Sequence, residues 1–238
     1  MTVADGLALV AILIGAAASA VTGIGFSLVS APLLTLALGG GDGVRLANTL
    51  ATGVNLLLLR REWRSAVVRD VLLLLVPAAL AITATALVIS HANPRALSVA
   101  SGVLILVAVA ALASGVRIRR LAGVVGGVVA GAISGAMNVV GGVGGPAVAS
   151  YALNADWSPR QTRSTLAIYF LAINVVSVAS RGVPPLSPAF GIGSIVAVVV
   201  GFGLGSLLAR RVDANSIRWG TLVLAAAGAC AAIAQGPR

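Results

Sequence analysis

The 238-residue chain has no lysine, one cysteine and one histidine, and charged residues make up only 9% of it. Without lysine there is no Walker A loop, so the chain does not hydrolyse ATP through that motif. A single cysteine cannot form an internal disulfide. Soluble domains carry roughly 25% charged residues. These absences exclude a P-loop ATPase, a disulfide-stabilised scaffold and an ordinary soluble domain.

Long apolar runs take the place of charge. Hydrophobic residues make up 59% of the chain, and its mean hydropathy is +1.07. Nearly uncharged runs of about 17–21 residues recur along the whole length, which matches the roughly 30 Å of hydrocarbon that a helix must cross. The sequence therefore predicts an all-α polytopic membrane protein. We expect a single integral membrane domain over residues 1–238, in the inner or plasma membrane of a bacterial-type cell.

The net charge of +10 comes from arginines, most of which lie in short links between the apolar runs. That placement is typical of cytoplasmic loops and of contact with anionic lipid headgroups. With the loop at residues 60–70 in the cytoplasm, twelve of the sixteen arginines fall on the inner side. The lipid bilayer is therefore a predicted partner, and nucleic acid is not.

The chain also matches itself at a shift of about 114–120 residues. SAPLLTLAL at 30–38 aligns with GGPAVASYAL at 144–153, which places Pro32 over Pro146. ANTLATGVNLLL at 47–58 aligns with RSTLAIYFLAINVV at 163–176, and a third match follows in the same order. Ordered matches of this kind indicate an internal duplication. We place the repeats at 5–116 and 119–236.

Each repeat contains five apolar segments, the second of which is too short to span hydrocarbon as a straight helix. An odd number of segments reverses the direction of the second copy, so we expect two inverted-topology repeats, as in many secondary transporters. Each repeat would hold a glycine-broken pair of short helices followed by three transmembrane helices. The short pair forms either two tilted crossings or a re-entrant hairpin. The segments are 6–22, 26–38, 44–59, 71–90 and 97–115, then 121–137, 139–153, 164–180, 189–209 and 217–234.

Glycines interrupt corresponding places in the two repeats, in VTGIGFSLVSAP at 21–32 and MNVVGGVGGPAV at 137–148. Broken helices are tolerated in membranes where they line a cavity. The unpaired N–H groups and positive dipole end of the following helix attract an anion. We therefore predict a shared anion site at the two breaks. Its candidate residues there are Gly23, Gly25, Ser27, Asn138, Gly141, Gly142, Gly144 and Gly145.

Close helix packing is the alternative role for a membrane glycine. Gly123, Gly127, Gly131 and Gly135 recur at every fourth position, so we expect them to line one packed helix face. The glycines between 141 and 145 break that spacing and precede a proline. Those glycines are assigned to the site.

Polar residues gather in the third segment of each repeat, directly after the breaks. Each of them can simply form a hydrogen bond between helices, and an arginine near a helix end can extend to lipid headgroups. Their concentration in the two duplicated segments favours a shared substrate site. The candidates are Asn48, Thr49, Thr52, Arg163, Ser164, Thr165 and Tyr169.

At these residues the chain resembles the TauE/SafE family of sulfite and organosulfonate exporters. GGVGGPAVASYAL at 141–153 and RQTRSTLAIYF at 160–170 are similar to the family pattern, whereas GIGFSLVSAP at 23–32 has fewer glycines than that pattern. The resemblance covers essentially the whole chain. It implies the movement of sulfur-containing or other small organic anions.

We therefore expect a secondary transporter or facilitator for sulfite, thiosulfate or an organosulfonate, with no cofactor or metal. The apolar segments contain no carboxylate for a proton relay. An inside-negative potential drives a monovalent anion outward by about 2.3 kcal/mol per 100 mV, so export is favoured. One histidine, one cysteine and no acid at depth argue against an enzyme. An anion channel and a non-transporting assembly factor stay open as alternatives, as does a homo-oligomer.

Overall fold

The computed structural model describes residues 3–23, 25–115, 123–209, 211 and 214–235. Five arginines of the predicted charge distribution (Arg117, Arg119, Arg120, Arg210 and Arg238) lie outside these residues. The described chain is all-helical, as the sequence predicts. Its elements are α1 (Val3–Thr22), α2 (Gly25–Leu38), α3 (Gly40–Glu62), the 3-10 helix η1 (Trp63–Ser65), α4 (Val68–Ile89), α5 (Pro94–Ser114), α6 (Gly123–Gly141), α7 (Gly145–Asn154), α8 (Pro159–Arg181), α9 (Pro188–Leu208) and α10 (Ala214–Gln235).

The helices correspond one to one with the predicted segments, but the second break lies later than expected. The sequence divides the chain between residues 137 and 139, whereas α6 continues to Gly141 and α7 starts at Gly145. Asn138 is part of the helix, and its carbonyl oxygen accepts the last turn's bond from the Gly142 N–H at 2.9 Å. Gly142 then leaves the helix with a φ of +70°. The predicted boundary at Asn138 is wrong for this reason.

Among the described residues, seven helices are long and apolar enough to cross a membrane: α1, α4, α5, α6, α8, α9 and α10. The sequence predicts three transmembrane helices after each break (α3, α4 and α5, then α8, α9 and α10). Of these, only α3 is absent from the set of seven. It has 23 residues, but its sequence includes Asp42, Arg45 and the terminal Arg60–Glu62 charges. Its length suffices for a crossing, while its polarity requires burial against other helices.

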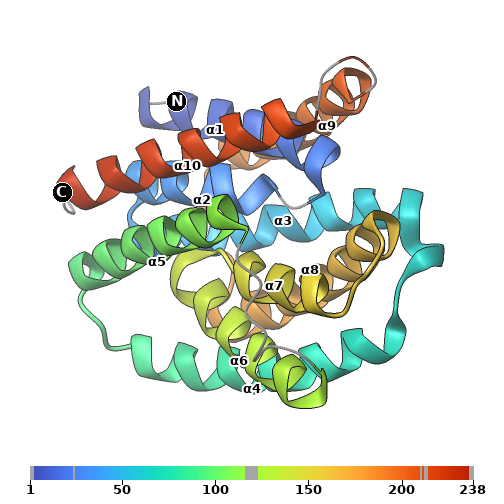
Figure 1. Cartoon of the computed structure of the whole chain (residues 1–238). Coiled ribbons are helices and arrows are strands. Elements are labelled where there is room, and N and C mark those ends of the chain that lie inside the picture. The colour runs from blue at the N-terminus through green and yellow to red at the C-terminus, as the bar shows by residue number, and fades with distance from the viewer. Residues whose placement is uncertain (1–2, 24, 116–122, 210, 212–213, 236–238) are drawn as a thin grey trace.

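The helices form three layers (Figure 1). α1 and α9 pack together on one side of the molecule with α10, and α4 and α6 pack together on the opposite side. The polar helices α3 and α8 contact each other between these layers. The polar side chains Asn48 and Asn55 of α3 and Ser164, Thr165, Asn174 and Ser177 of α8 are buried in this middle layer.

Glycines bring the outer helix pairs into backbone contact. A Cβ added at Gly131 would lie 2.2 Å from the carbonyl oxygen of Leu74, and one at Gly135 would lie 2.3 Å from that of Ala78. Gly127 likewise packs against Leu73 of α4. The predicted packing role is confirmed for these three glycines, whereas Gly123 has nothing within 4 Å. α9 packs against α1 in the same way, through Gly201 and Gly205.

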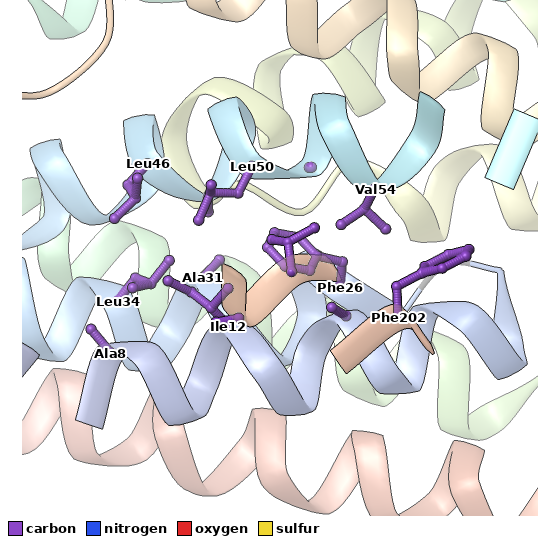
Figure 2. Close-up of a cluster of buried hydrophobic side chains, with 14 of the residues drawn as sticks. Ala8, Ile12, Phe26, Ala31, Leu34, Leu46, Leu50, Val54 and Phe202 are labelled. Atoms are coloured by element: carbon purple, nitrogen blue, oxygen red, sulfur yellow. The ribbon is translucent and has the colours of Figure 1, made fainter. Parts of the chain in front are cut away.

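A hydrophobic core lies between the first three helices and α9 (Figure 2). Ile12 of α1, Leu34 of α2 and Leu46 of α3 are almost completely buried there. Phe202 extends into the same cluster from α9. This core fixes the positions of α1 and α2 on either side of the first break.

The glycine contacts predict a contrast between two positions on α9. Gly205→Ala would place a methyl group 2.2 Å from the carbonyl oxygen of Ala17, and overpacking of this kind costs about 1–3 kcal/mol. Gly203 has nothing within 4 Å, and alanine there removes the helix penalty of glycine. In detergent, we expect Gly205→Ala to lower the Tm by several degrees, at about 2–4 °C per kcal/mol.

Gly203→Ala is the matched control and is expected to unfold at or above the wild-type Tm. Equal melting temperatures for the two variants would show that the α1–α9 contact is not tight.

Candidate functional site

Both predicted breaks end the preceding helix with a glycine in the left-handed region. Gly23 has a φ of +83° and Gly142 a φ of +70°. The Gly23 N–H donates to the Ser19 carbonyl at 2.8 Å, and the Gly142 N–H donates to the Asn138 carbonyl at 2.9 Å. These bonds are the αL helix ending that glycine favours. The two breaks therefore use the same local device.

A small cavity of about 40 Å³ lies between the breaks. It has room for about three waters. The end of α1, the start of α2 and the middle of α3 form one side, and the end of α6, the α6–α7 link and α8 form the other. None of the lining residues is charged. They are Ser19, Gly23, Phe26, Ser27, Leu28, Ala51, Asn55, Asn138, Gly142, Val143, Gly144, Gly145, Phe170 and Asn174.

The starts of two helices face this cavity. Phe26, Ser27 and Leu28 belong to the first turn of α2, and Gly144 and Gly145 lie at the start of α7. The first N–H groups of a helix have no intrahelical partner, and its dipole places positive charge there. The neutral lining therefore presents two partly positive backbone ends.

The opposite, negative helix end at the second break is occupied by donors. The Asn138 carbonyl accepts a bond from Asn48 Nδ2 at 3.2 Å in addition to that from Gly142. The Val139 carbonyl accepts one from Arg181 Nη1 at 2.8 Å. The Arg181 carbonyl in turn accepts a hydrogen bond from Arg45 Nη1 at 3.2 Å. The carbonyl end of α6 is thus neutralised by side chains from α3 and α8.

The carbonyl end at the first break is also covered. Thr22 Oγ1 donates to the Ala18 carbonyl at 2.9 Å, beside the Gly23 bond to Ser19. The aliphatic part of Arg163 lies across Gly23, where an added Cβ would be 3.1 Å from Arg163 Cγ. α8 therefore places Arg163, near its start, against the first break and Arg181, at its end, against the second.

Buried amides in and beside the cavity wall join α6 to α8 and to α3. Asn138 Nδ2 donates to Asn174 Oδ1 at 3.2 Å and to Ser177 Oγ at 2.8 Å. All three residues are at most 2% exposed. With Asn48 they form an amide cluster from α3, α6 and α8. This cluster fixes the end of α6 relative to both polar helices.

The structure divides the predicted site residues into groups. Gly23, Ser27, Asn138, Gly142, Gly144 and Gly145 line the cavity. Gly25 and Arg163 line a separate, larger pocket. Gly141, which is buried, lies at the end of α6 without lining the cavity.

The remaining candidates on α3 and α8 do not line the cavity. Thr49 and Thr52 donate to the carbonyls of Arg45 and Asn48 within their own helix. Thr165 Oγ1 accepts the Val67 N–H at 3.0 Å and so holds the start of α4.

Several buried polar atoms near the break helices have no hydrogen-bond partner. They are Asn48 Oδ1, Ser134 Oγ, Ser164 Oγ and Tyr169 Oη. Ser134 Oγ would lie 2.6 Å from a Cβ added at Gly144, so it adjoins the cavity wall. Unpaired buried hydroxyls are uncommon in proteins. The hydroxyls among them can donate to a solute or water beside the breaks, and Asn48 Oδ1 can accept a hydrogen bond.

Sequence reasoning left four polar residues out of the site. Ser19, Asn55 and Asn174 line the cavity, and Arg181 caps α6. Ser19 stands four residues before Gly23, on the same helix face, and that spacing is a usable signal. Asn55 and Asn174 continue the polar faces of their helices. Arg181 carries no local signal, because its contact is with a residue 42 positions away.

No three His, Cys, Asp or Glu side chains come together as a metal site anywhere in the described ranges. A family model described as "Sulfite exporter TauE/SafE" matches residues 7–232. No curated protein matches the chain, and no solved structure does.

Gly144 and Gly145 predict different outcomes for the same substitution. Gly144→Ala would place Cβ 2.6 Å from Ser134 Oγ and 2.8 Å from the Ser134 carbonyl oxygen, so we expect a loss of about 1–3 kcal/mol of stability. Gly145→Ala meets only Phe170 Cζ, at 3.9 Å, and is expected to keep the wild-type Tm in detergent. A Gly145→Ala protein that melts below Gly144→Ala would contradict the described link geometry.

Proposed function

The chain belongs to the TauE/SafE sulfite exporter family, and on that premise we propose that it carries sulfite, thiosulfate or an organosulfonate outward across the cell membrane as a secondary transporter. Members of this family are multi-pass membrane transporters and not enzymes. The substrate, the direction and the site residues are our proposal.

One observation supports an anion as the substrate. At each break, carbonyls near the end of the first helix (Ser19 at the first, Asn138 and Val139 at the second) accept hydrogen bonds, whereas the start of the second helix lines the cavity. Glycine at these positions lets the backbone approach a solute closely. A solute in the cavity therefore meets the positive dipole ends of α2 and α7.

We propose that the repeats are inverted, and two features support this. If each helix is replaced by its counterpart in the other repeat, the α1–α9 pair becomes the α6–α4 pair and the α3–α8 pair maps onto itself. All three pairs are in contact. The hairpins also have opposite directions. Thr22, at the bend of α1–α2, shares a pocket with Leu153, at the far end of α7, while the bend of α6–α7 adjoins Arg181.

The proposed substrate site comprises the six cavity-lining candidates together with Ser19, Asn55 and Asn174. The backbone N–H groups of the two breaks bind the anion, and the amides hold the breaks in place. The other candidates (Gly25, Asn48, Thr49, Thr52, Gly141, Arg163, Ser164, Thr165 and Tyr169) support the helices that form it or lie on its approach.

The neutral lining supports export driven by the membrane potential. None of the cavity residues is acidic, basic or histidine, so the cavity offers no side chain for a proton relay. An inside-negative potential supplies about 2.3 kcal/mol per 100 mV for the outward movement of one negative charge. A second candidate, an anion channel, needs an open path, whereas a cavity of about 40 Å³ favours a carrier that must change conformation.

A flux panel in proteoliposomes tests the function directly. We expect saturable flux, with counterflow, of at least one of sulfite, thiosulfate and a sulfonate, and an increase in flux when a potential is imposed. A pH gradient without a potential should give no accumulation. Accumulation under the pH gradient alone would reject potential-driven export, and flux without saturation or counterflow would favour the channel.

Filling the cavity tests the site. Gly145→Val directs its branched side chain into the space beside Phe170, so we expect a more than tenfold loss of flux with the wild-type Tm retained. Gly191→Val on α9, where nothing lies within 4 Å, is the control and should transport normally. Wild-type flux in folded Gly145→Val would place the pathway elsewhere.

A further inference from the structure

A second pocket, of about 500 Å³, lies next to the small cavity. The ends of α1, α5 and α7 and the starts of α2, α8 and α10 surround it. Leu28 lines both the pocket and the cavity. Gly23 lines the cavity and is covered by Arg163, which lines the pocket. Leu28 and Arg163 therefore form the partition between the two spaces.

The pocket has an electropositive side and apolar walls. Arg163 and Arg218 contribute positive charge from different helices, and none of the lining residues is acidic. Arg218 Nη2 donates to the Leu112 carbonyl at 2.6 Å, so this guanidinium is held at the pocket. Leucines from α2, α5, α7 and α10, together with a valine, a tryptophan and a proline, form most of the remaining wall.

The aromatic wall is also fixed in place. Trp157 lines the pocket, and its Nε1 donates to Asp70 Oδ2 at 3.2 Å. Asp70 itself does not line the pocket. The indole therefore presents an apolar face with its only polar atom already bonded.

We propose that this pocket is an entry vestibule for an oxyanion with an apolar body, and that it favours such organic anions over bare inorganic ones. The inference rests on the proposed transport function and names a binding step before the small cavity. The volume lies within the range of about 300–1,000 Å³ that is typical of sites for small organic molecules. The two guanidinium groups match an oxyanion head, and the leucines and Trp157 match a hydrocarbon body.

An anionic lipid headgroup has the same chemistry as a soluble organic anion. The two sources differ in one respect: a substrate must pass Leu28 into the cavity, whereas a lipid would remain in the pocket. Competition and flux together therefore separate them.

Calorimetry with purified protein tests the vestibule, using hexanesulfonate and methanesulfonate, which share a head and differ only in the apolar body. We expect hexanesulfonate to bind at least tenfold more tightly. Arg218→Gln should weaken its binding at least fivefold. Arg64→Gln removes an equal charge from an exposed position outside the pocket and should bind as wild type does.

A second variant keeps the test independent of Arg218. Leu153 lines the pocket at the end of α7, beside the polar residues Asn154 and Asp156, so Leu153→Glu should fold and repel the sulfonate. Hexanesulfonate binding that is unchanged in both folded variants would overturn the vestibule. So would equal affinities for the two sulfonates.

Lipid competition and flux measurements distinguish the vestibule from a lipid site, and its failure from the failure of the transport proposal. If phosphatidylglycerol micelles displace hexanesulfonate in an Arg218-dependent manner and proteoliposomes carry no hexanesulfonate, the pocket is a lipid site and the vestibule is refuted. If sulfite flux is normal while both Arg218→Gln and Leu153→Glu leave hexanesulfonate binding and flux unchanged, the vestibule fails and the transport proposal stands. If wild-type protein carries no anion, the transport proposal fails, and with it the vestibule.

Discussion

The breaks in α1 and α6 depend on one constraint: inside a membrane, each backbone polar group freed by a helix interruption must find a partner in the protein. An unsatisfied group costs several kcal/mol in hydrocarbon. At the second break the carbonyls of Asn138 and Val139 are bonded by Gly142, Asn48 and Arg181. The N–H groups that begin α7 face the cavity instead. In the proposed site, this unequal treatment of the two helix ends would favour an anion.

The absence of charge in the cavity has a physical advantage for a transporter. A buried guanidinium would need a permanent partner, because desolvation of an unpaired charge is costly, and that partner would compete with an anionic solute. Backbone dipoles carry about half a charge each and need no counter-ion. The arginines lie outside the cavity instead, Arg163 and Arg181 at opposite ends of α8. Eighteen residues of helix separate them, a rise of roughly 27 Å, so each approach to the cavity has its own positive group.

The sequence predicted the helical fold and the glycine breaks, because these features rest on local composition. α2 was predicted within one residue, since Gly23 and Gly25 mark its start. The start of α7 was placed too early, because Asn138 and the following valines are compatible with either helix and only the positive φ of Gly142 decides. The amide cluster and the contact of Arg181 with Val139 join residues far apart in the chain. No local pattern encodes such pairings.

The glycine contacts also restrict how a carrier with this fold can change conformation. Glycines of α9 rest on main-chain carbonyls of α1, and glycines of α6 rest on those of α4. Interfaces packed this closely resist sliding. The α3–α8 interface has no such glycine contact among the described residues; a hydrogen bond from Arg45 to the Arg181 carbonyl crosses it, and Asn48 links α3 to α6. A bond such as that from Asn48 to the Asn138 carbonyl contributes only about 0.6–1.7 kcal/mol in a membrane. Alternating access would therefore keep each outer pair as a rigid unit and exchange polar contacts around α3 and α8. The cavity would then open first past Leu28 at one break and next past Arg181 at the other.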